Sequence, residues 1–334
     1  MEYQKQAQEG YSLAPTIILG SGASIAYGIC SMGELATHLI DSISTLNFSQ
    51  DEQAQWTEFC ALLNDNVDLE TALHRVVLSD VLTNLVVEET WNLINPQDLS
   101  IFDDSLNNQI DFPLGTLIKS MFRSAHTRIN IITTNYDRLA EYACDKEGFL
   151  HFSGFSYGYL KRLTDSQELR PQRLVNIWKV HGSLDWFKTP LGDTCALGNI
   201  STIPSNHSPQ IVTPGTEKYR LTHREPYRSI IHKADDAILS ANSYLCIGFG
   251  FNDEHIQEKL IEKCVRSDAH ITVVTHTLSD AAKSFLFDSN VRNYLAIERG
   301  RHDDESVIHS SLSEEPISVD ANYWSLSGFL NLIL

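Results

Sequence analysis

The sequence of 334 residues has no long apolar run and no excess of positive charge. No window approaches the run of about 18 apolar residues that a membrane helix needs, and the polar N-terminal segment lacks the apolar stretch of a secretory signal. Lys and Arg total 25 against 43 Asp and Glu, so the formal net charge is −18. A field of this sign opposes non-specific binding of nucleic acid or anionic lipid. The sequence therefore predicts a cytoplasmic protein that binds neither nucleic acid nor membranes directly.

Cysteine is also scarce. The six cysteines include no Cys-x-x-Cys pair and have no nearby His at zinc-finger spacing. This pattern argues against a disulfide framework and against a zinc ribbon. Small hydrophobic residues that stay reduced in a cytosol are the alternative. We therefore expect no structural zinc and no other metal.

The remaining composition is that of an ordinary globular protein. A chain of this length holds about two units of roughly 150 residues, although one α/β domain with an inserted lobe fits equally well. Apolar, β-rich runs alternate with helical patterns from Pro15 onward and again after residue 126. This alternation predicts a mostly parallel, doubly wound sheet.

Four other segments have patterns of their own. In residues 45–125 apolar side chains recur every three or four positions, which predicts a helical insertion. Residues 188–223 are rich in Pro, Gly, Ser, Thr and Asn and predict a loop-rich module. The polar residues 298–320 are expected to form a surface loop. The apolar residues 322–334 predict a terminal helix that docks on the core or on another subunit.

A Gly-rich turn follows the first predicted strand. Gly20, Gly22 and Gly28 in LGSGASIAYGICSM bracket the passage from strand to helix, where glycines let the backbone approach a diphosphate. The spacing departs from Gly-x-Gly-x-x-Gly, so a plain dehydrogenase fingerprint fits poorly. A Gly-rich turn that binds nothing is the alternative.

Polar residues follow two further predicted strands. Asn135 and Asp137 in ITTNYDRLAEYA lie just past a strand's carboxyl end, where open α/β sheets bind ligands, although such residues also cap helices. His181 in WKVHGSLDWF follows an apolar strand, a setting that suits an imidazole in proton transfer. A purely structural His is the alternative. A fourth motif, CIGFGFNDEHI, places Gly248 and Gly250 before a polar helix start. In a parallel sheet these strand ends are expected to converge.

Together the ordered motifs GSGAS, TTNYD, KVHGSLDW and IGFGFND resemble the sirtuin superfamily, and in detail its bacterial sirtuin-like NADase branch from antiphage defence systems. The match spans roughly residues 15–40 and 126–280. The resemblance implies a Rossmann-like NAD-binding domain of residues 1–44 and 126–334. Within or beside it lie the helical insertion 45–125 and the loop-rich module 188–223, without a zinc ribbon.

The resemblance also assigns roles. It implies that Asn135 and Asp137, with Thr134 beside them, line the pocket for nicotinamide and ribose. His181 corresponds to the family histidine that handles ribose hydroxyl protons, and His276, after Thr275, takes the place of an adenosine contact. The NAD diphosphate loop and the second NAD-contacting turn comprise Gly20, Ser21, Gly22, Ala23, Ser24, Gly28, Gly248 and Gly250.

Three departures from the sirtuin pattern bear on the activity. Thr134 stands where deacylases have Gln, and Cys30, Ser31 and Met32 replace the usual Asp-Phe-Arg. The zinc-binding cysteine quartet is missing. These departures argue against deacylation but not against cleavage of NAD.

The resemblance thus implies an NAD+ hydrolase that takes NAD as its substrate and releases nicotinamide and ADP-ribose. Cleavage requires the enzyme to hold the ribose, stabilise developing positive charge and present a nucleophile. Asn135 is assigned to orienting the ribose and the attacking water, His181 to general-base catalysis, and Asp137 to a supporting carboxylate.

Control in trans follows from the same resemblance, because an NADase that is always active would empty the cell of NAD. We expect an antiviral effector that a separately encoded partner, such as a HerA-like hexameric ATPase, activates. The apolar C-terminal segment predicts a homo-oligomer, with docking on the chain's own core as the alternative. A basic cluster could meet an acidic partner or phosphates, or form a solvated helix face. It comprises Lys218, Arg220, Arg224, Arg228 and Lys233.

Two other functions remain open. A protein deacylase or ADP-ribosyltransferase would release nicotinamide only when a peptide or another acceptor is supplied. A non-catalytic sensor of NAD or ADP-ribose would keep the Gly-rich loop without a working base, and the presence of both Asn135 and His181 argues against it.

Overall fold

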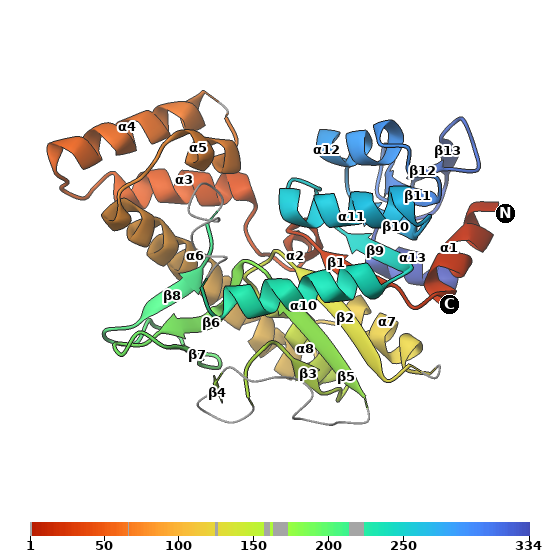
Figure 1. Cartoon of the computed structure of the whole chain (residues 1–334), viewed down its shortest axis with the longest axis horizontal. Coiled ribbons are helices and arrows are strands. Elements are labelled where there is room, and N and C mark those ends of the chain that lie inside the picture. The colour runs from red at the N-terminus through yellow and green to blue at the C-terminus, as the bar shows by residue number, and fades with distance from the viewer. Residues whose placement is uncertain (1, 66, 124–125, 157–160, 163–172, 214–223) are drawn as a thin grey trace.

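A mainly parallel sheet forms the centre of the protein, with a helical lobe and a small antiparallel sheet beside it (Figure 1). The computed structural model describes the chain except for residues 1, 66, 124–125, 157–160, 163–172 and 214–223. The two chain ends lie near each other, because the first and last helices are in contact.

The described strands of the main sheet follow the order β13-β12-β11-β10-β9-β1-β2-β5-β3. Pairing is parallel from β3 through β11, and the last two strands pair in antiparallel fashion. The central order β5-β2-β1-β9-β10-β11 is that of a doubly wound Rossmann sheet. The predicted fold class is confirmed. The strands are β1 (Thr16–Leu19), β2 (Arg128–Thr133), β3 (His151–Phe152), β5 (Leu174–Lys179), β9 (Ser243–Ile247), β10 (His270–Thr275), β11 (Tyr294–Arg299), β12 (Ser306–Ser310) and β13 (Ile317–Val319).

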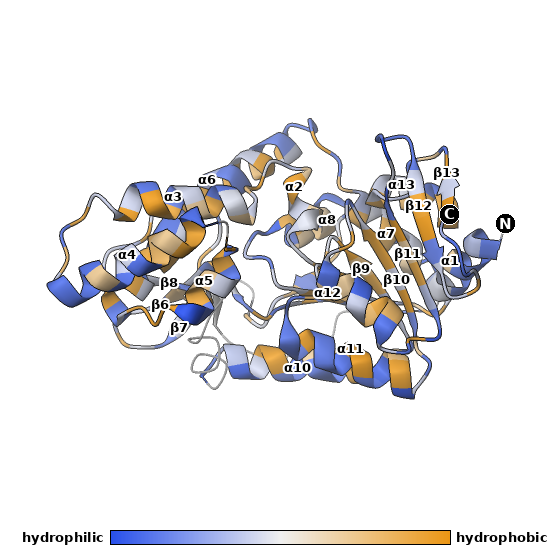
Figure 2. Ribbon diagram, turned by 90° about the horizontal axis from the view of Figure 1, so that it is seen from above, coloured by the Kyte–Doolittle hydropathy of each residue, from blue (hydrophilic) through white to orange (hydrophobic). Residues whose placement is uncertain are grey.

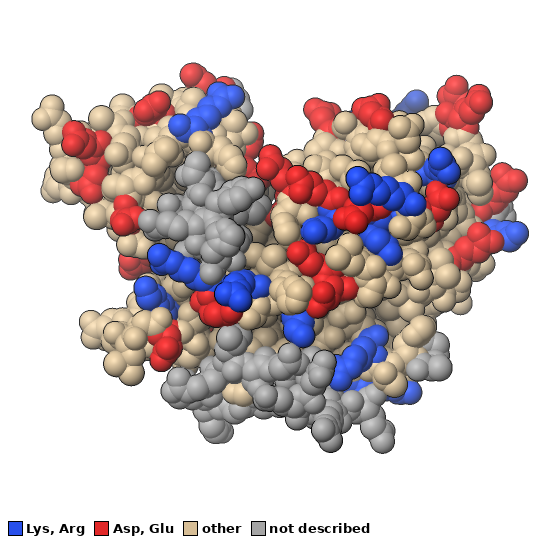
Figure 3. Space-filling view, in the orientation of Figure 1, with Lys and Arg blue, Asp and Glu red and all other residues tan. Residues whose placement is uncertain are grey.

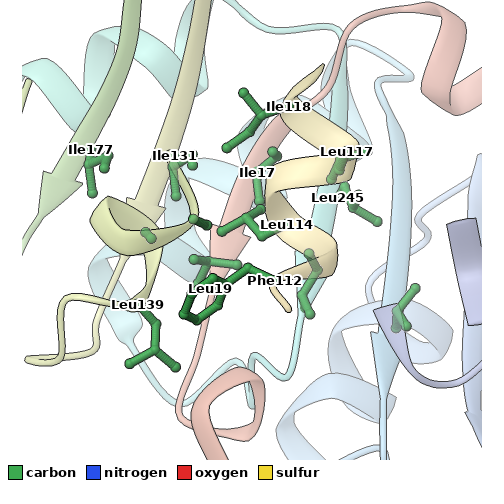
Figure 4. Close-up of a cluster of buried hydrophobic side chains, with 14 of the residues drawn as sticks. Ile17, Leu19, Phe112, Leu114, Leu117, Ile118, Ile131, Leu139, Ile177 and Leu245 are labelled. Carbon is green, nitrogen blue, oxygen red and sulfur yellow. The ribbon is translucent and has the colours of Figure 1, made fainter. Parts of the chain in front are cut away.

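Alternation along the strands builds two apolar layers, because successive side chains point to opposite faces. Ile17 and Leu19 belong to one buried cluster, shown in Figure 4, while Ile18 belongs to the other. Helices cover both faces, and Figure 2 shows the apolar strands between them. The first face meets α7 (Pro113–Met121), α8 (Leu139–Lys146) and α13 (Leu326–Ile333). The second meets α10 (Tyr227–Ser240), α11 (Glu254–Arg266), α12 (Asp280–Lys283) and the π-helical turn η2 (Ser284–Asp288).

The helical lobe has a core of its own. Leu35, Leu39 and Ile43 pack on Trp56 and Phe59. A Ser at each N-cap and a Glu three residues later form capping boxes that start the first two of the lobe's helices. The lobe consists of α3 (Met32–Ile43), α4 (Gln50–Asn64), α5 (Leu69–Arg75) and α6 (Asp80–Leu106). Residues 50–121 are thus largely helical, but α7 packs on the main sheet and α3 begins before residue 45.

The segment expected to be rich in loops contributes two short strands to the small sheet. β7 (Thr194–Ala196) and β8 (Ser208–Ile211) pair with β6 (Gly182–Lys188), and β4 (Lys161–Arg162) completes the order β4-β7-β6-β8. The apolar run around His181 is therefore two strands joined by a tight turn. The part of the module beyond residue 213 lies outside the described residues.

The expectation of a surface loop at residues 298–320 is wrong. This segment finishes β11 and forms β12 and β13 at the edge of the sheet. Its buried positions include Ser306 and Ser310, whose hydroxyls donate to Ala321 O and Gln6 Oε1, both at 2.7 Å. Small polar side chains with internal partners can occupy an edge strand, so the segment lacks the apolar alternation by which strands are recognised.

The N-terminal helix α1 (Glu2–Ser12) was likewise not foreseen, because its composition is polar. It packs against α13 and the strands β9, β10 and β11. In the part of the chain that the structure describes, no helix combines the length and the hydropathy needed to cross a membrane.

Candidate functional site

The register of the sheet brings the predicted motifs to one edge. Leu19 of β1 pairs with Thr133 of β2 and with Ile247 of β9. Thr133 pairs in turn with Lys179, and Ile247 with Val274. Because these strands are parallel, the residues that follow them lie at the same carboxyl edge, where doubly wound sheets bind ligands. Those residues are Gly20, Thr134, Val180, Gly248 and Thr275.

The two Gly-rich turns touch each other at this edge. Gly20 N donates to Ile247 O at 3.1 Å, and Gly22 N donates to Gly248 O at 3.0 Å. Gly248 has a φ of 56°, and a Cβ there would lie 2.2 Å from the amide nitrogen of Ala23. Glycine is therefore required sterically at this contact. The helix after the first turn, α2 (Gly22–Ile25), is a single turn, and the longer amphipathic helix α3 follows it.

Asn135 is held by hydrogen bonds to the Gly-rich turn. Its Nδ2 donates to Gly20 O at 2.9 Å and to Ser24 Oγ at 3.0 Å. Ser24 Oγ donates to Asp137 Oδ2 at 2.7 Å. Both hydrogens of the Asn135 amide are thus used, and among the described residues nothing donates to its Oδ1. That oxygen remains an acceptor at the edge of the sheet.

Asp137 is buried, and its carboxylate accepts hydrogen bonds within this network. Its Oδ1 accepts from Leu139 N at 3.2 Å, so both carboxyl oxygens have partners within the protein. Burial raises the pKa of Asp137, while the Lys179 ammonium and the Ser24 hydroxyl oppose this change. Asp137 is therefore placed to orient Ser24 and, through it, Asn135.

Lys179 at the end of β5 is a residue that sequence reasoning missed. Its side chain is fully buried, donates to Asp137 O and lies 3.4 Å from Glu141 Oε1. A buried ammonium requires such partners. In the sequence, Lys179 lies two residues before His181 in an apolar strand. This pattern does not predict that its ammonium donates to the backbone oxygen of Asp137.

A second buried network joins the same loop to α6. Arg138 Nη2 lies 2.6 Å from Asp98 Oδ2, and Arg138 N donates to Asp98 Oδ1 at 2.7 Å. Tyr142 Oη also donates to Asp98 Oδ2, at 2.5 Å. Burial and the Asp98 carboxylate raise the pKa of Tyr142, which stays a neutral donor. The long helix of the lobe is thereby fixed to the Asn135–Asp137 loop.

His181 lies in the turn between β5 and β6. Gly182 has a φ of 85°, and a Cβ there would lie 2.0 Å from Gln210 O, so the turn depends on glycine. His181 Nε2 lies 2.8 Å from Asp253 Oδ2, and these side chains are 14% and 5% exposed. Asp253 belongs to the IGFGFND motif. The sequence singled out that segment but gave no role to its aspartate.

A cavity of about 180 Å³ opens beside the Asn135 network. This volume is below the roughly 300–1,000 Å³ of most ligand sites, so it could enclose part of a dinucleotide. Of the predicted site residues, those that line it are Gly22, Ala23, Ser24, Asn135, Asp137, Gly248, Thr275 and His276. Those outside its lining are Gly20, Ser21, Gly28, Thr134, His181 and Gly250.

The cavity also has two walls that the motifs did not predict. One is residues 112–114 at the start of α7, and the other is the segment from Trp324 to Ser327. The rings of His276 and Trp324 meet edge to face with centroids 5.4 Å apart. A larger cavity of about 580 Å³ lies between α7, α8 and α13 and shares Phe112, Pro113 and Ser327 with the smaller one.

Surface charge, the basic cluster and the candidate metal ligands identify no further part of the site among the described residues. Figure 3 shows acidic and basic side chains mixed over the visible face, and Arg228 and Lys233 share α10 with Asp235 and Asp236. Of the basic cluster, Lys218 and Arg220 lie outside the described residues. Across the described residues no group of three or more His, Cys, Asp or Glu could hold a metal. None of the six cysteines, which all lie among the described residues, forms a disulfide.

Comparison with known proteins gives a family match. Residues 129–306 match the SIR2-like domain family. No curated protein matches the chain in sequence. Among solved structures, the chain is similar to Sir2Tm bound to a propionylated peptide, at 15% identity and a TM-score of 0.45, covering 86% of this chain and 91% of that one. It is also similar to a mutant Sir2 homologue in complex with ADP-ribose, at 12% identity and a TM-score of 0.47, covering 84% and 88%.

Proposed function

The chain belongs to the SIR2-like domain family, and on that premise we propose that it is an NAD+ hydrolase. It would cleave the bond between nicotinamide and ribose with water, giving nicotinamide, ADP-ribose and a proton. The observation that carries this proposal is the arrangement of Asn135. Its amide is fixed by Gly20 and Ser24, and its Oδ1 stays available as an acceptor beside a cavity.

The residues at the edge fit NAD as a substrate. The close contact of Gly20 and Gly22 with Gly248 fixes the two turns beside the cavity, and the absence of side chains at these glycines would let a diphosphate approach. The cavity lined by His276 and Trp324 would take the adenosine end. Asn135 and His181 follow neighbouring strands and would face the ribose next to nicotinamide.

The chemistry needs three contributions from these residues. Asn135 Oδ1 would accept a hydrogen bond from a ribose hydroxyl or from the attacking water and hold it in reactive geometry. As the carbon–nitrogen bond breaks, its electron pair passes to nicotinamide, which leaves as a neutral molecule. Water then bonds to the ribose carbon, and His181 takes the released proton. Asp137 supports the reaction through Ser24.

The test is nicotinamide release by the purified chain. Asn135→Ala and His181→Ala should each lower kcat by about 10²–10⁴-fold, because each removes a group used in the transition state. The double variant should lose much less than the product of the two factors, since both residues serve one transition state. Affinity for ADP-ribose should change far less than kcat. Asn92→Ala and His302→Ala, both on the exposed surface, are the matched controls.

The outcomes separate the proposal from its alternatives. Near wild-type release by either folded single variant would contradict the assigned roles. Release only when an acylated peptide is added would identify a deacylase. Binding of ADP-ribose without turnover, also in cell extract that contains activating partners, would identify a sensor.

We also propose the biological setting that the motif resemblance implies. The chain would act as an antiphage effector, switched on by a separately encoded partner such as a HerA-like hexameric ATPase. Support for this setting comes from the four motifs alone. NAD levels in infected cells, with and without the candidate partner, test it directly.

A further inference from the structure

Asp253 uses its two carboxyl oxygens in different ways. Oδ1 accepts from Ile256 N at 2.9 Å and caps the N-terminus of α11. Oδ2 lies 2.8 Å from His181 Nε2. Asp253 is only 6% exposed, so its negative charge needs compensation inside the protein. The capping amide and the imidazole are positioned to supply it.

The backbone before Asp253 fixes this position. Phe251, two residues earlier, has a φ of 59°, which is unusual for a bulky residue. Its ring is buried, stacks on Phe285 at 4.8 Å and meets Phe249 at 4.9 Å. Packing of this kind can hold a strained backbone in place. The backbone around Phe251 therefore fixes the Asp253 carboxylate next to the turn that contains His181.

We propose that Asp253 is a positioning residue that holds His181 with the proton on Nε2, so that Nδ1 keeps the lone pair that accepts a proton from water. This inference rests on the proposed function, because it concerns the base of that reaction. A carboxylate beside one ring nitrogen favours the proton on that nitrogen, and the other nitrogen is then left unprotonated.

The position of Nε2 bears on this assignment. Nε2 is buried 2.8 Å from Asp253 Oδ2, although among the described residues no hydrogen bond to it is aligned. Catalytic hydrogen bonds are often poorly aligned before substrate binds. Nε2 is thus enclosed against the carboxylate, which leaves Nδ1 as the nitrogen for proton transfer.

A second histidine–aspartate pair includes His255, two residues after Asp253. His255 Nε2 lies 2.8 Å from Asp235 Oδ1 of α10. The hydrogen bond to Asp235 raises the pKa of His255, and the charge of Asp253 adds to this effect while Lys259 opposes it. His255 thus has a carboxylate partner of its own in Asp235.

Asp253→Asn is the variant that tests the proposal. An Asn at this position can still cap α11, because Asn is as good an N-cap as Asp, but it removes the charge. Release of nicotinamide should fall by about 10²–10⁴-fold in kcat, as when a histidine loses its orienting carboxylate. The dissociation constant for ADP-ribose should change by less than about 3-fold. Asp68→Asn is the matched control, since Asp68 caps α5 with the same bond to the third residue onward.

Two readouts separate positioning from a general structural role. In a His181→Ala background, Asp253→Asn should cause no further loss of residual activity, whereas damage to the fold would lower activity in both backgrounds. In protein labelled with ¹⁵N-histidine, the signals of His181 should show the proton on Nε2, and Asp253→Asn should shift protons to Nδ1.

The spectra do not require turnover, so they distinguish the two proposals. If the tautomer shifts as expected but the wild-type chain releases no nicotinamide with its partner present, the proposed function fails and the positioning role stands. If wild-type His181 carries its proton on Nδ1, or if Asp253→Asn leaves the tautomer unchanged, the positioning role is overturned. A loss of activity in Asp253→Asn that also appears in the His181→Ala background overturns it as well.

Discussion

Single residues at the sheet edge have little freedom to change. Gly20, Gly22 and Gly248 pack so closely that a Cβ at any of them would lie within 3.0 Å of backbone atoms of the other turn. Backbone atoms cannot rotate away as the end of a long side chain can, so a methyl group here must separate the two turns.

Gly248→Ala should abolish the close contact between these turns. The new Cβ would lie 2.2 Å from Ala23 N, and the φ of 56° is unfavourable for alanine. We expect at least about a 10-fold loss of ADP-ribose affinity, together with a lower melting temperature. Gly192→Ala is the control, because Gly192 has a φ of 92° and no heavy atom within 4 Å of its Cβ position. Equal affinities for the two variants, measured by calorimetry, would argue against the Gly-rich turns as the diphosphate site.

At the scale of single residues, the sequence predicts several of the residues that belong to the candidate site but not which of their atoms form hydrogen bonds. Asn135 and Asp137 could be singled out because they follow a recognisable strand. Their link through Ser24 spans more than a hundred residues, and so does the reach of Asn135 to Gly20. Lys179 and Asp253 were missed for the same reason, since their roles depend on partners that only the folded chain brings near.

At the scale of elements, α6 connects the lobe with the candidate site. Its indole Trp91 Nε1 donates to Leu184 O of β6 at 2.8 Å, and Asn95 Nδ2 donates to Ile200 O at 2.9 Å. Asp98, one turn further, holds Arg138 of the Asn135–Asp137 loop. A displacement of the lobe would therefore act on the loop through this helix, which suggests one path for control by a partner.

Asp98→Ala should strongly destabilise the protein. Arg138 is 4% exposed and would lose its carboxylate, so an uncompensated charge would remain buried. We expect unfolding free energy to fall by about 3–5 kcal/mol, measured by urea denaturation. Glu9→Ala removes the partner of Lys5 in an exposed pair and should leave the unfolding curve unchanged. An Asp98→Ala curve that overlays the wild type would show that this network does not hold the loop.

Elements were predictable where local patterns are strong. Apolar strands such as β9 and capped amphipathic helices such as α3 follow from alternation and helical spacing. β12 and α1 were not predicted because their buried positions are filled partly by Ser and Gln side chains with distant partners. These long-range hydrogen bonds can be recognised only in the tertiary structure. β13 was not predicted because it has only three residues and none of them is buried.

At the scale of the whole molecule, the chain end completes the core. Phe329, Leu330, Leu332 and Ile333 are all less than 8% exposed and pack where α13 meets α1 and α7. The apolar C-terminal segment is thus accounted for within the chain and gives no separate argument for a subunit interface. The same segment contributes Trp324 to the wall of the cavity.

Deletion of residues 323–334 should therefore impair folding and not merely association. Each of the four buried side chains contributes about 1.5–3 kcal/mol by leaving water, and their sum is comparable with the total stability of a typical domain. We expect a large drop in melting temperature and aggregation, because the faces of α1 and α7 become exposed. Removal of Leu334 alone, which is 60% exposed, is the control and should change neither property. A truncated chain that melts like the full-length protein, but that light scattering finds dissociated from oligomer to monomer, would instead identify the segment as an interface between subunits.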